Sequence, residues 1–125
     1  MRNDLSLLCL RLGLGLVFLL FGFDKLPNPQ NWIVFLPAYF KFIPLSAYQF
    51  LRLQGVIECL IGLHFFAGLF IRPIAFISAC ILAFIVYNLG FDQTGIRDTG
   101  LFFAALSLGF LGPGNWSLDA KLKWL

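Results

Sequence analysis

The side chains that could do chemistry are few, and they interrupt long apolar runs. Glu58 lies near the middle of the apolar run 47–71, and Arg97-Asp98 opens another run that continues to residue 112. An ionisable side chain inside a bilayer costs about 2.5–3.5 kcal/mol on insertion scales, so it turns toward a partner or a wet cavity. A guanidinium donates forked hydrogen bonds to carboxylates. We therefore expect these three residues to meet in a buried polar cluster.

Counting residues along the helices predicts which other side chains lie at the height of Glu58. Glu58 precedes the basic turn at Arg72 by 14 residues, and Asp98 precedes the glycine-proline stop by 14, a rise of about 21 Å in each case. The same step along the intervening helix reaches Tyr87 and Asn88. Three helices are thus expected to bring polar side chains to one level.

Three further polar residues are expected slightly above this level, from where Lys25 can reach down to it. Gln54 lies one turn from Glu58 on the same helix face, and the first helix ends with Asp24 and Lys25. Arg97 can hold one or both carboxylates, and Lys25 can balance the other. The predicted site contains eight residues: Glu58, Arg97, Asp98, Gln54, Asn88, Tyr87, Lys25 and Asp24.

Such a cluster has two uses that the sequence leaves open. It can be an ion-pair clasp that only orients the helices. It can also be a polar pocket that opens away from the N-terminal side and takes a quinone headgroup, a small anion or a proton path. In a third case the helix register differs and the depths do not match.

The amino-acid composition predicts whether this chain is surrounded by water or by lipid. Hydrophobic residues make up 60% and charged residues 12% of its 125 residues, whereas soluble domains have about 25% charged residues. The net charge of +3 is scattered, so we expect a lipid bilayer and no nucleic acid as partner. One histidine and three dispersed cysteines make no metal site. No cofactor is expected to be held by this chain alone.

The elements that position the site are predicted to be all α-helical. Apolar runs predict one integral membrane four-helix bundle over residues 1–125, with helices at about 5–25, 47–71, 73–91 and 96–111. A short interfacial segment at about 29–43 and an amphipathic tail at 115–125 complete it. Arg11 interrupts the first helix, and its guanidinium either extends to the headgroups or pairs inside the bundle. The placement of Lys and Arg predicts a multi-pass protein with both termini cytoplasmic.

Several stretches resemble one family. Residues 11–26, RLGLGLVFLLFGFDKL, resemble the first-helix pattern of the DoxX-like membrane proteins. Glu58 followed by Gly62, the turn at Arg72, Arg97-Asp98 and the GPGNWSLD stretch at 112–119 also look like that family. The resemblance covers most of the chain, and residues 27–44 are the least diagnostic. It implies a four-helix bundle in the cytoplasmic membrane of a bacterium or archaeon.

The resemblance also suggests a function. The family is named for small subunits associated with a terminal quinol oxidase and with thiosulfate:quinone oxidoreduction. We therefore expect an accessory or anchor subunit of a quinone-linked membrane redox complex, with other membrane subunits or further copies as partners. Quinone is the ligand that this implies, and no catalysis by the chain alone is expected. Two alternatives stay open: a small oligomeric transporter of a solute or protons, and a purely structural subunit of a larger respiratory or photosynthetic assembly.

Overall fold

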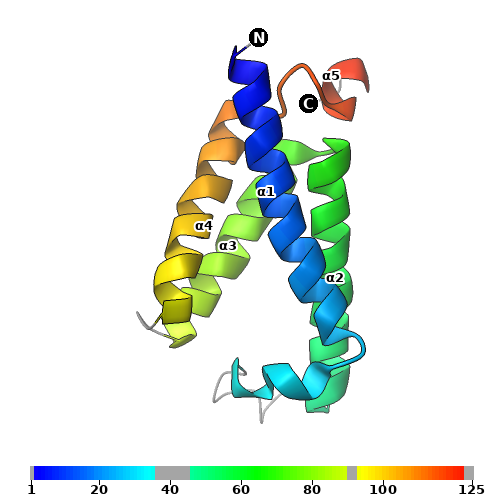
Figure 1. Cartoon of the computed structure of the whole chain (residues 1–125), viewed down its shortest axis with the longest axis vertical. Coiled ribbons are helices and arrows are strands. Elements are labelled where there is room, and N and C mark those ends of the chain that lie inside the picture. Colours follow the sequence, from blue (N-terminus) through cyan, green and yellow to red (C-terminus); the bar gives the residue numbers. More distant parts are fainter. Residues whose placement is uncertain (1, 36–45, 90–92, 123–125) are drawn as a thin grey trace.

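The computed structural model describes residues 2–35, 46–89 and 93–122, and within them the predicted all-α bundle of four long helices is confirmed (Figure 1). The elements in chain order are α1 (Arg2–Lys25), the 3₁₀ helix η1 (Pro29–Phe35), α2 (Ala47–Ala67), α3 (Ile71–Leu89), α4 (Gln93–Leu111) and the short α5 (Leu118–Leu122). The predicted segment 29–43 appears as η1, and its residues 36–43 lie outside the described part.

The boundary between α2 and α3 differs from the prediction. The second helix was expected to continue to residue 71, but it ends at Ala67, because Gly68 adopts a left-handed conformation with φ of 73°. This residue is a frequent helix stop, since glycine has no Cβ that would clash there. Pro73 lies in the first turn of α3, where its missing N–H would have had no helical partner.

Helices α1 and α2 are antiparallel and pack closely through glycines. Gly22 faces Gly55, and Gly15, seven residues earlier on α1, faces Gly62, seven residues later on α2. A Cβ built on Gly22 would lie 2.6 Å from the carbonyl oxygen of Gly55, so the two backbones touch with no side chain between them. Small residues allow this approach in membrane helices, where dispersion contacts replace the hydrophobic effect between helices.

This contact predicts the effect of a single methyl group. We expect Gly22→Ala to destabilise the protein by about 1–3 kcal/mol, because the new Cβ meets two backbone atoms of α2 and the Cβ of Glu58, none of which can rotate away. Gly13→Ala is the matched control on the same helix, where a Cβ meets no atom within 4 Å, and it should be neutral or stabilising. Unfolding by denaturing detergent measures both. Equal effects of the two substitutions would contradict the close packing.

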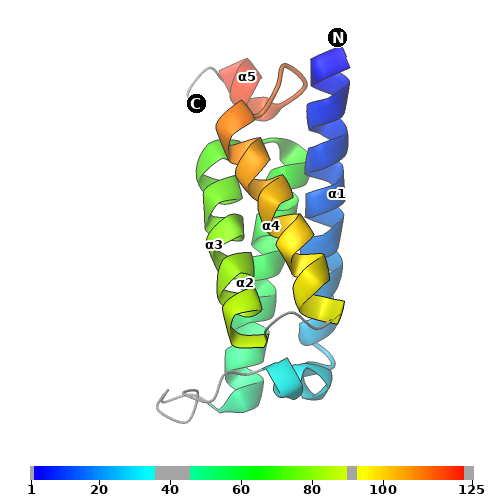
Figure 2. The ribbon, with the colours of Figure 1, turned by 90° about the vertical axis from the view of Figure 1, so that its left-hand side faces the viewer.

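The remaining helices complete a core that is concentrated at one end of the molecule. The buried apolar cluster includes Leu14, Phe18, Ile61, Phe65, Ile71, Ala75, Ala79, Leu82, Ala105 and Leu108. Figure 1 shows that α3 and α4 diverge from α1 and α2 toward the end that carries η1. The N-terminus of α1 and helix α5 lie together at the opposite end (Figure 2).

The outer faces of the helices are apolar. Among the described residues, Asn3–Lys25 and Ala47–Ala67 are long and apolar enough to cross a membrane, and Ile71–Tyr87 is a shorter apolar helix. Large apolar side chains that are at least half exposed include Leu16, Leu20, Phe23, Leu60, Leu63, Phe84, Phe103 and Phe110. This pattern suits helices whose surroundings are acyl chains.

Candidate functional site

A buried ion pair joins α1 to α2. The Lys25 Nζ lies 2.8 Å from Oε1 and 2.9 Å from Oε2 of Glu58, and the two residues are only 5% and 4% exposed. The glycine crossing explains why they meet, because the missing side chain of Gly55 leaves room for the first carbon of the lysine side chain. The acid that the sequence placed at the centre of the site is therefore neutralised by the last residue of the first helix.

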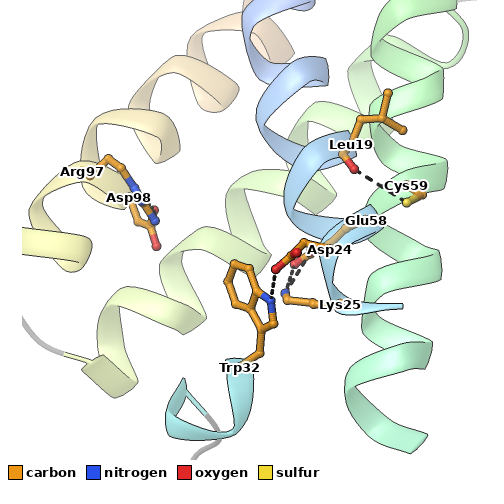
Figure 3. A network of polar contacts seen from close by, with 8 residues as sticks. All are labelled: Leu19, Asp24, Lys25, Trp32, Glu58, Cys59, Arg97 and Asp98. Carbon is orange, nitrogen blue, oxygen red and sulfur yellow. Dashed lines mark hydrogen bonds and ion pairs between the residues drawn. The ribbon is translucent and has the colours of Figure 1, made fainter. Parts of the chain in front are cut away.

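A second ion pair lies on α4. Asp98 is buried, and its Oδ1 accepts from the Arg97 Nε at 3.2 Å and Nη2 at 3.1 Å. The Arg97 side chain is 51% exposed, and its guanidinium carbon lies 5.0 Å from the centre of the Phe21 ring. Figure 3 shows this pair and the Lys25–Glu58 pair on separate helices with a space between them.

The 3₁₀ helix η1 adds an aromatic side chain to the site. The Trp32 Nε1 donates to Oδ2 of Asp24 at 2.8 Å, which folds the loop back against the end of α1. The Lys25 Nζ lies 4.8 Å from the centre of the indole ring, within the range of a cation–π contact. The Trp32 and Phe21 rings are 5.5 Å apart.

These groups enclose a cavity of about 150 Å³ where the two helix pairs diverge. Its walls come from all four long helices and η1. The lining residues are Val17, Phe18, Phe21, Lys25, Trp32, Leu51, Gln54, Glu58, Leu82, Ile85, Thr94, Arg97, Asp98 and Leu101. The lining thus combines apolar and aromatic side chains with charged, amide and hydroxyl groups.

Two uncharged polar side chains at this cavity have unused hydrogen-bonding capacity. Within residues 2–35, 46–89 and 93–122, the Gln54 amide and the Thr94 hydroxyl have no hydrogen-bond partner. The described side-chain atoms that are fully buried, by contrast, are all satisfied. The cavity therefore offers groups that can bind a guest molecule without breaking an existing contact.

Five of the eight residues predicted from the sequence line this cavity: Glu58, Arg97, Asp98, Gln54 and Lys25. Asp24 contacts it only through Trp32. The expectation for Tyr87 was wrong, because this side chain is 87% exposed on the outer face of α3. The side chain of Asn88 lies outside the described part of the structure.

The ion pairs fall within the expectation that Arg97 holds one or both acids and Lys25 balances the other. Arg97 pairs with Asp98, and Lys25 pairs with Glu58. Sequence reasoning placed Trp32 in the interfacial segment 29–43 and Thr94 between the predicted helices 73–91 and 96–111, and so missed both as cavity residues. The eight-residue spacing of Asp24 and Trp32 across two prolines was the available signal for the folded-back loop.

A second polar cluster lies at the opposite end of the bundle. Arg11 is 2% exposed and donates to the carbonyl oxygens of Phe65 (3.2 Å), Pro113 (3.2 Å) and Trp116 (2.9 Å). Asp119 is fully buried and accepts from the first backbone amides of α3. Of the two interpretations of Arg11, the structure supports burial inside the bundle, with backbone carbonyls as the partners.

No metal centre is visible in the part of the chain that the structure covers. There, no three His, Cys, Asp or Glu side chains lie together in a way that could hold an ion. The three cysteines are free thiols. The acids of the site are occupied by Lys25, Arg97 and Trp32 instead.

Comparison with known proteins agrees with the arrangement. The family model described as DoxX matches residues 6–90, which include most of α1 and all of η1, α2 and α3. The uncharacterized membrane protein Rv3486 of Mycobacterium tuberculosis is 29% identical over 136 residues, covering 94% of this chain and 82% of the relative. No solved structure matches the chain. With a family model matching well over half of its length, the chain belongs to the DoxX family of membrane proteins.

Proposed function

We propose that this protein is a non-catalytic subunit of a quinone-linked redox complex in the cytoplasmic membrane, and that the cavity beside Glu58 binds the quinone ring. In this proposal the four long helices cross the membrane, and both termini are cytoplasmic. The single observation that carries it is the cavity between the two ion pairs, whose lining combines apolar side chains with a few polar groups.

The size of the cavity suits one six-membered ring. An apolar protein cavity of about 150 Å³ is known to admit benzene, and this one has the same volume. The rings of Phe18 and Phe21 and the aliphatic side chains of Leu82, Ile85 and Leu101 provide walls for a flat, uncharged guest. Ligand sites of this kind combine apolar walls with a few convergent polar groups.

The polar groups in the lining of the cavity suit carbonyl oxygens. A quinone presents two acceptors on opposite edges of its ring. The Gln54 amide and the Thr94 hydroxyl are donors without a partner among the described residues, and the Arg97 guanidinium is half exposed beside them. A small anion would compete with the carboxylates of Glu58 and Asp98 for the same cations, so a neutral acceptor fits better.

Fluorescence of Trp32 tests the proposal. Replacing the other two tryptophans, by Trp116→Phe and Trp124→Phe, leaves one indole at the cavity wall. We expect saturable quenching by a short-chain quinone in detergent micelles. Gln54→Leu should weaken binding about five-fold, the loss of one hydrogen bond worth about 1 kcal/mol. Leu101→Phe, which fills the cavity, should weaken it at least as much.

The control is Leu20→Phe, the same substitution at a side chain that is 57% exposed on the outer face of α1. Two results would contradict a quinone site and favour the structural clasp. One is quenching that never saturates, and the other is an equal change in quenching by Leu101→Phe and Leu20→Phe. Gentle purification from native membranes tests the assembly. An electron-transfer protein should co-elute, whereas a homo-oligomer that conducts protons in vesicles would support transport instead.

A further inference from the structure

A groove lies at the end of the molecule opposite the quinone cavity. It has a volume of about 410 Å³ and runs between α1, the last turn of α2 and the segment that leads into α5. In Figure 1 these elements meet beside the N-terminus. The lining residues are Leu8, Arg11, Phe66, Ala67, Asn115, Trp116, Ser117, Leu118 and Lys121.

The charge at the base of this groove is unusual for its position. The C-terminal end of a helix carries exposed carbonyls and a partial negative charge, so it normally repels anions. Here α2 ends in the groove, but Arg11 donates to the carbonyl oxygens of Phe65 at 3.2 Å and Phe66 at 3.5 Å. The guanidinium therefore replaces a negative helix end by a fixed positive charge.

A second cation stands at the rim. Lys121 is exposed, and none of the described residues pairs with its ammonium group. Asp119 is attracted by the Arg11 guanidinium, but it is fully buried, and both of its carboxylate oxygens accept from the backbone amides of Phe70 and Ile71. Within the described residues, it therefore leaves Lys121 without a paired acid at the rim. Asp4 does not line the groove, and its carboxylate accepts from the backbone and side chain of Asn115.

The rest of the groove is apolar and aromatic. Leu8 and Phe66 form its inner wall. Trp116 is 47% exposed and Leu118 is 40% exposed, so both present surface to whatever lies in the groove. Tryptophan is typical of the level where acyl chains give way to headgroups. A ligand that fits must combine a negative group with an apolar tail.

We propose that this groove binds an anionic phospholipid, with the phosphodiester bound by Lys121 and attracted by the buried charge of Arg11 beneath it, and an acyl chain along Leu8, Phe66 and Leu118. Basic pockets at helix ends on the cytoplasmic side are known to select such headgroups. The site is independent of the quinone cavity, because the two lie at opposite ends of the bundle and share no lining residue.

Lipid titration of the intact protein, followed by native mass spectrometry, tests this site. Phosphatidylglycerol and phosphatidylcholine with identical acyl chains are the probes. We expect the wild type to prefer phosphatidylglycerol about five-fold or more, which corresponds to about 1 kcal/mol for one cation near an anionic headgroup. Lys121→Gln should remove most of that preference, and Lys121→Arg should keep it.

The matched control is Arg52→Gln, which removes an exposed cation from α2 near the η1 end. It should leave the preference unchanged. Equal binding of the two lipids to the wild type, or equal losses in Lys121→Gln and Arg52→Gln, would overturn the proposal. Displacement of the lipid by soluble glycerol phosphate would also overturn it, because that result assigns the groove to a free phosphate ester.

Discussion

Glu58→Ala is expected to destabilise the bundle by about 3–5 kcal/mol, the range measured when one partner of a buried ion pair is removed. The cost arises at Lys25, whose ammonium group is 5% exposed and loses both of its hydrogen bonds, at 2.8 and 2.9 Å. Arg97 contributes little, since it is half exposed and stays paired with Asp98. Unfolding by denaturing detergent in mixed micelles measures the difference from the wild type.

A double substitution separates the cost of leaving one buried charge unpaired from the net contribution of the ion pair to stability. Replacing a buried pair by apolar groups is often neutral or stabilising, so Lys25→Met combined with Glu58→Leu should recover most of the loss. Ile57→Ala is the control, since this neighbour on α2 is 43% exposed. A loss in Glu58→Ala no larger than in this control, or a double variant no better than the single one, would mean that the pair is hydrated and not buried.

The positions of the polar side chains along the helix axes could be predicted from the sequence. Apolar run lengths predicted the four long helices, and counting at 1.5 Å per residue placed Glu58 and Asp98 at one level. Both line the same cavity, together with Gln54, Lys25 and Arg97. Height along a helix depends on the residue number alone, which is why this part of the site was predictable without knowing how the helices pack.

The direction in which a side chain points was not predictable in the same way. On α3 the cavity is lined by Leu82 and Ile85, which are three residues apart and share a face. Tyr87, two residues after Ile85 on the same helix, points outward instead. Because every face of this helix is apolar, its sequence has no polar stripe that would indicate which side meets the neighbouring helices.

Partner choice depended on tertiary distances. Lys25 and Arg97 are both cations near the height of Glu58, and the charges alone do not distinguish them. The close contact of Gly22 with Gly55 decides the matter, because it brings the end of α1 against α2. The role of Trp32 likewise required knowing that η1 folds back onto Asp24.

The cluster around Arg11 was missed for a different reason, and it gives the second large prediction. Its acceptors are backbone carbonyls of residues 65, 66, 113 and 116, which a search for opposite charges does not find. We expect Arg11→Met to destabilise the protein by about 3 kcal/mol or more, since several buried acceptors lose their donor and each costs about 1–3 kcal/mol. Asp119 would also lose the attraction of the nearby guanidinium.

Two further variants show whether the geometry of the guanidinium matters. Arg11→Lys should recover only part of the stability, because a single ammonium group cannot reach carbonyls on α2 and on the 113–116 segment together. Arg72→Met is the matched control: Arg72 also donates to the carbonyls at a helix end, those of Gly109 and Phe110 on α4, but it is exposed. The Arg72→Met substitution should lower the free energy of unfolding by less than about 1 kcal/mol, because water can replace an exposed donor.

Hydrogen exchange should then increase in residues 68–72 and 113–119 of Arg11→Met alone. Equal protection of these amides in Arg11→Met and Arg72→Met would mean that Arg11 does not hold the two segments together.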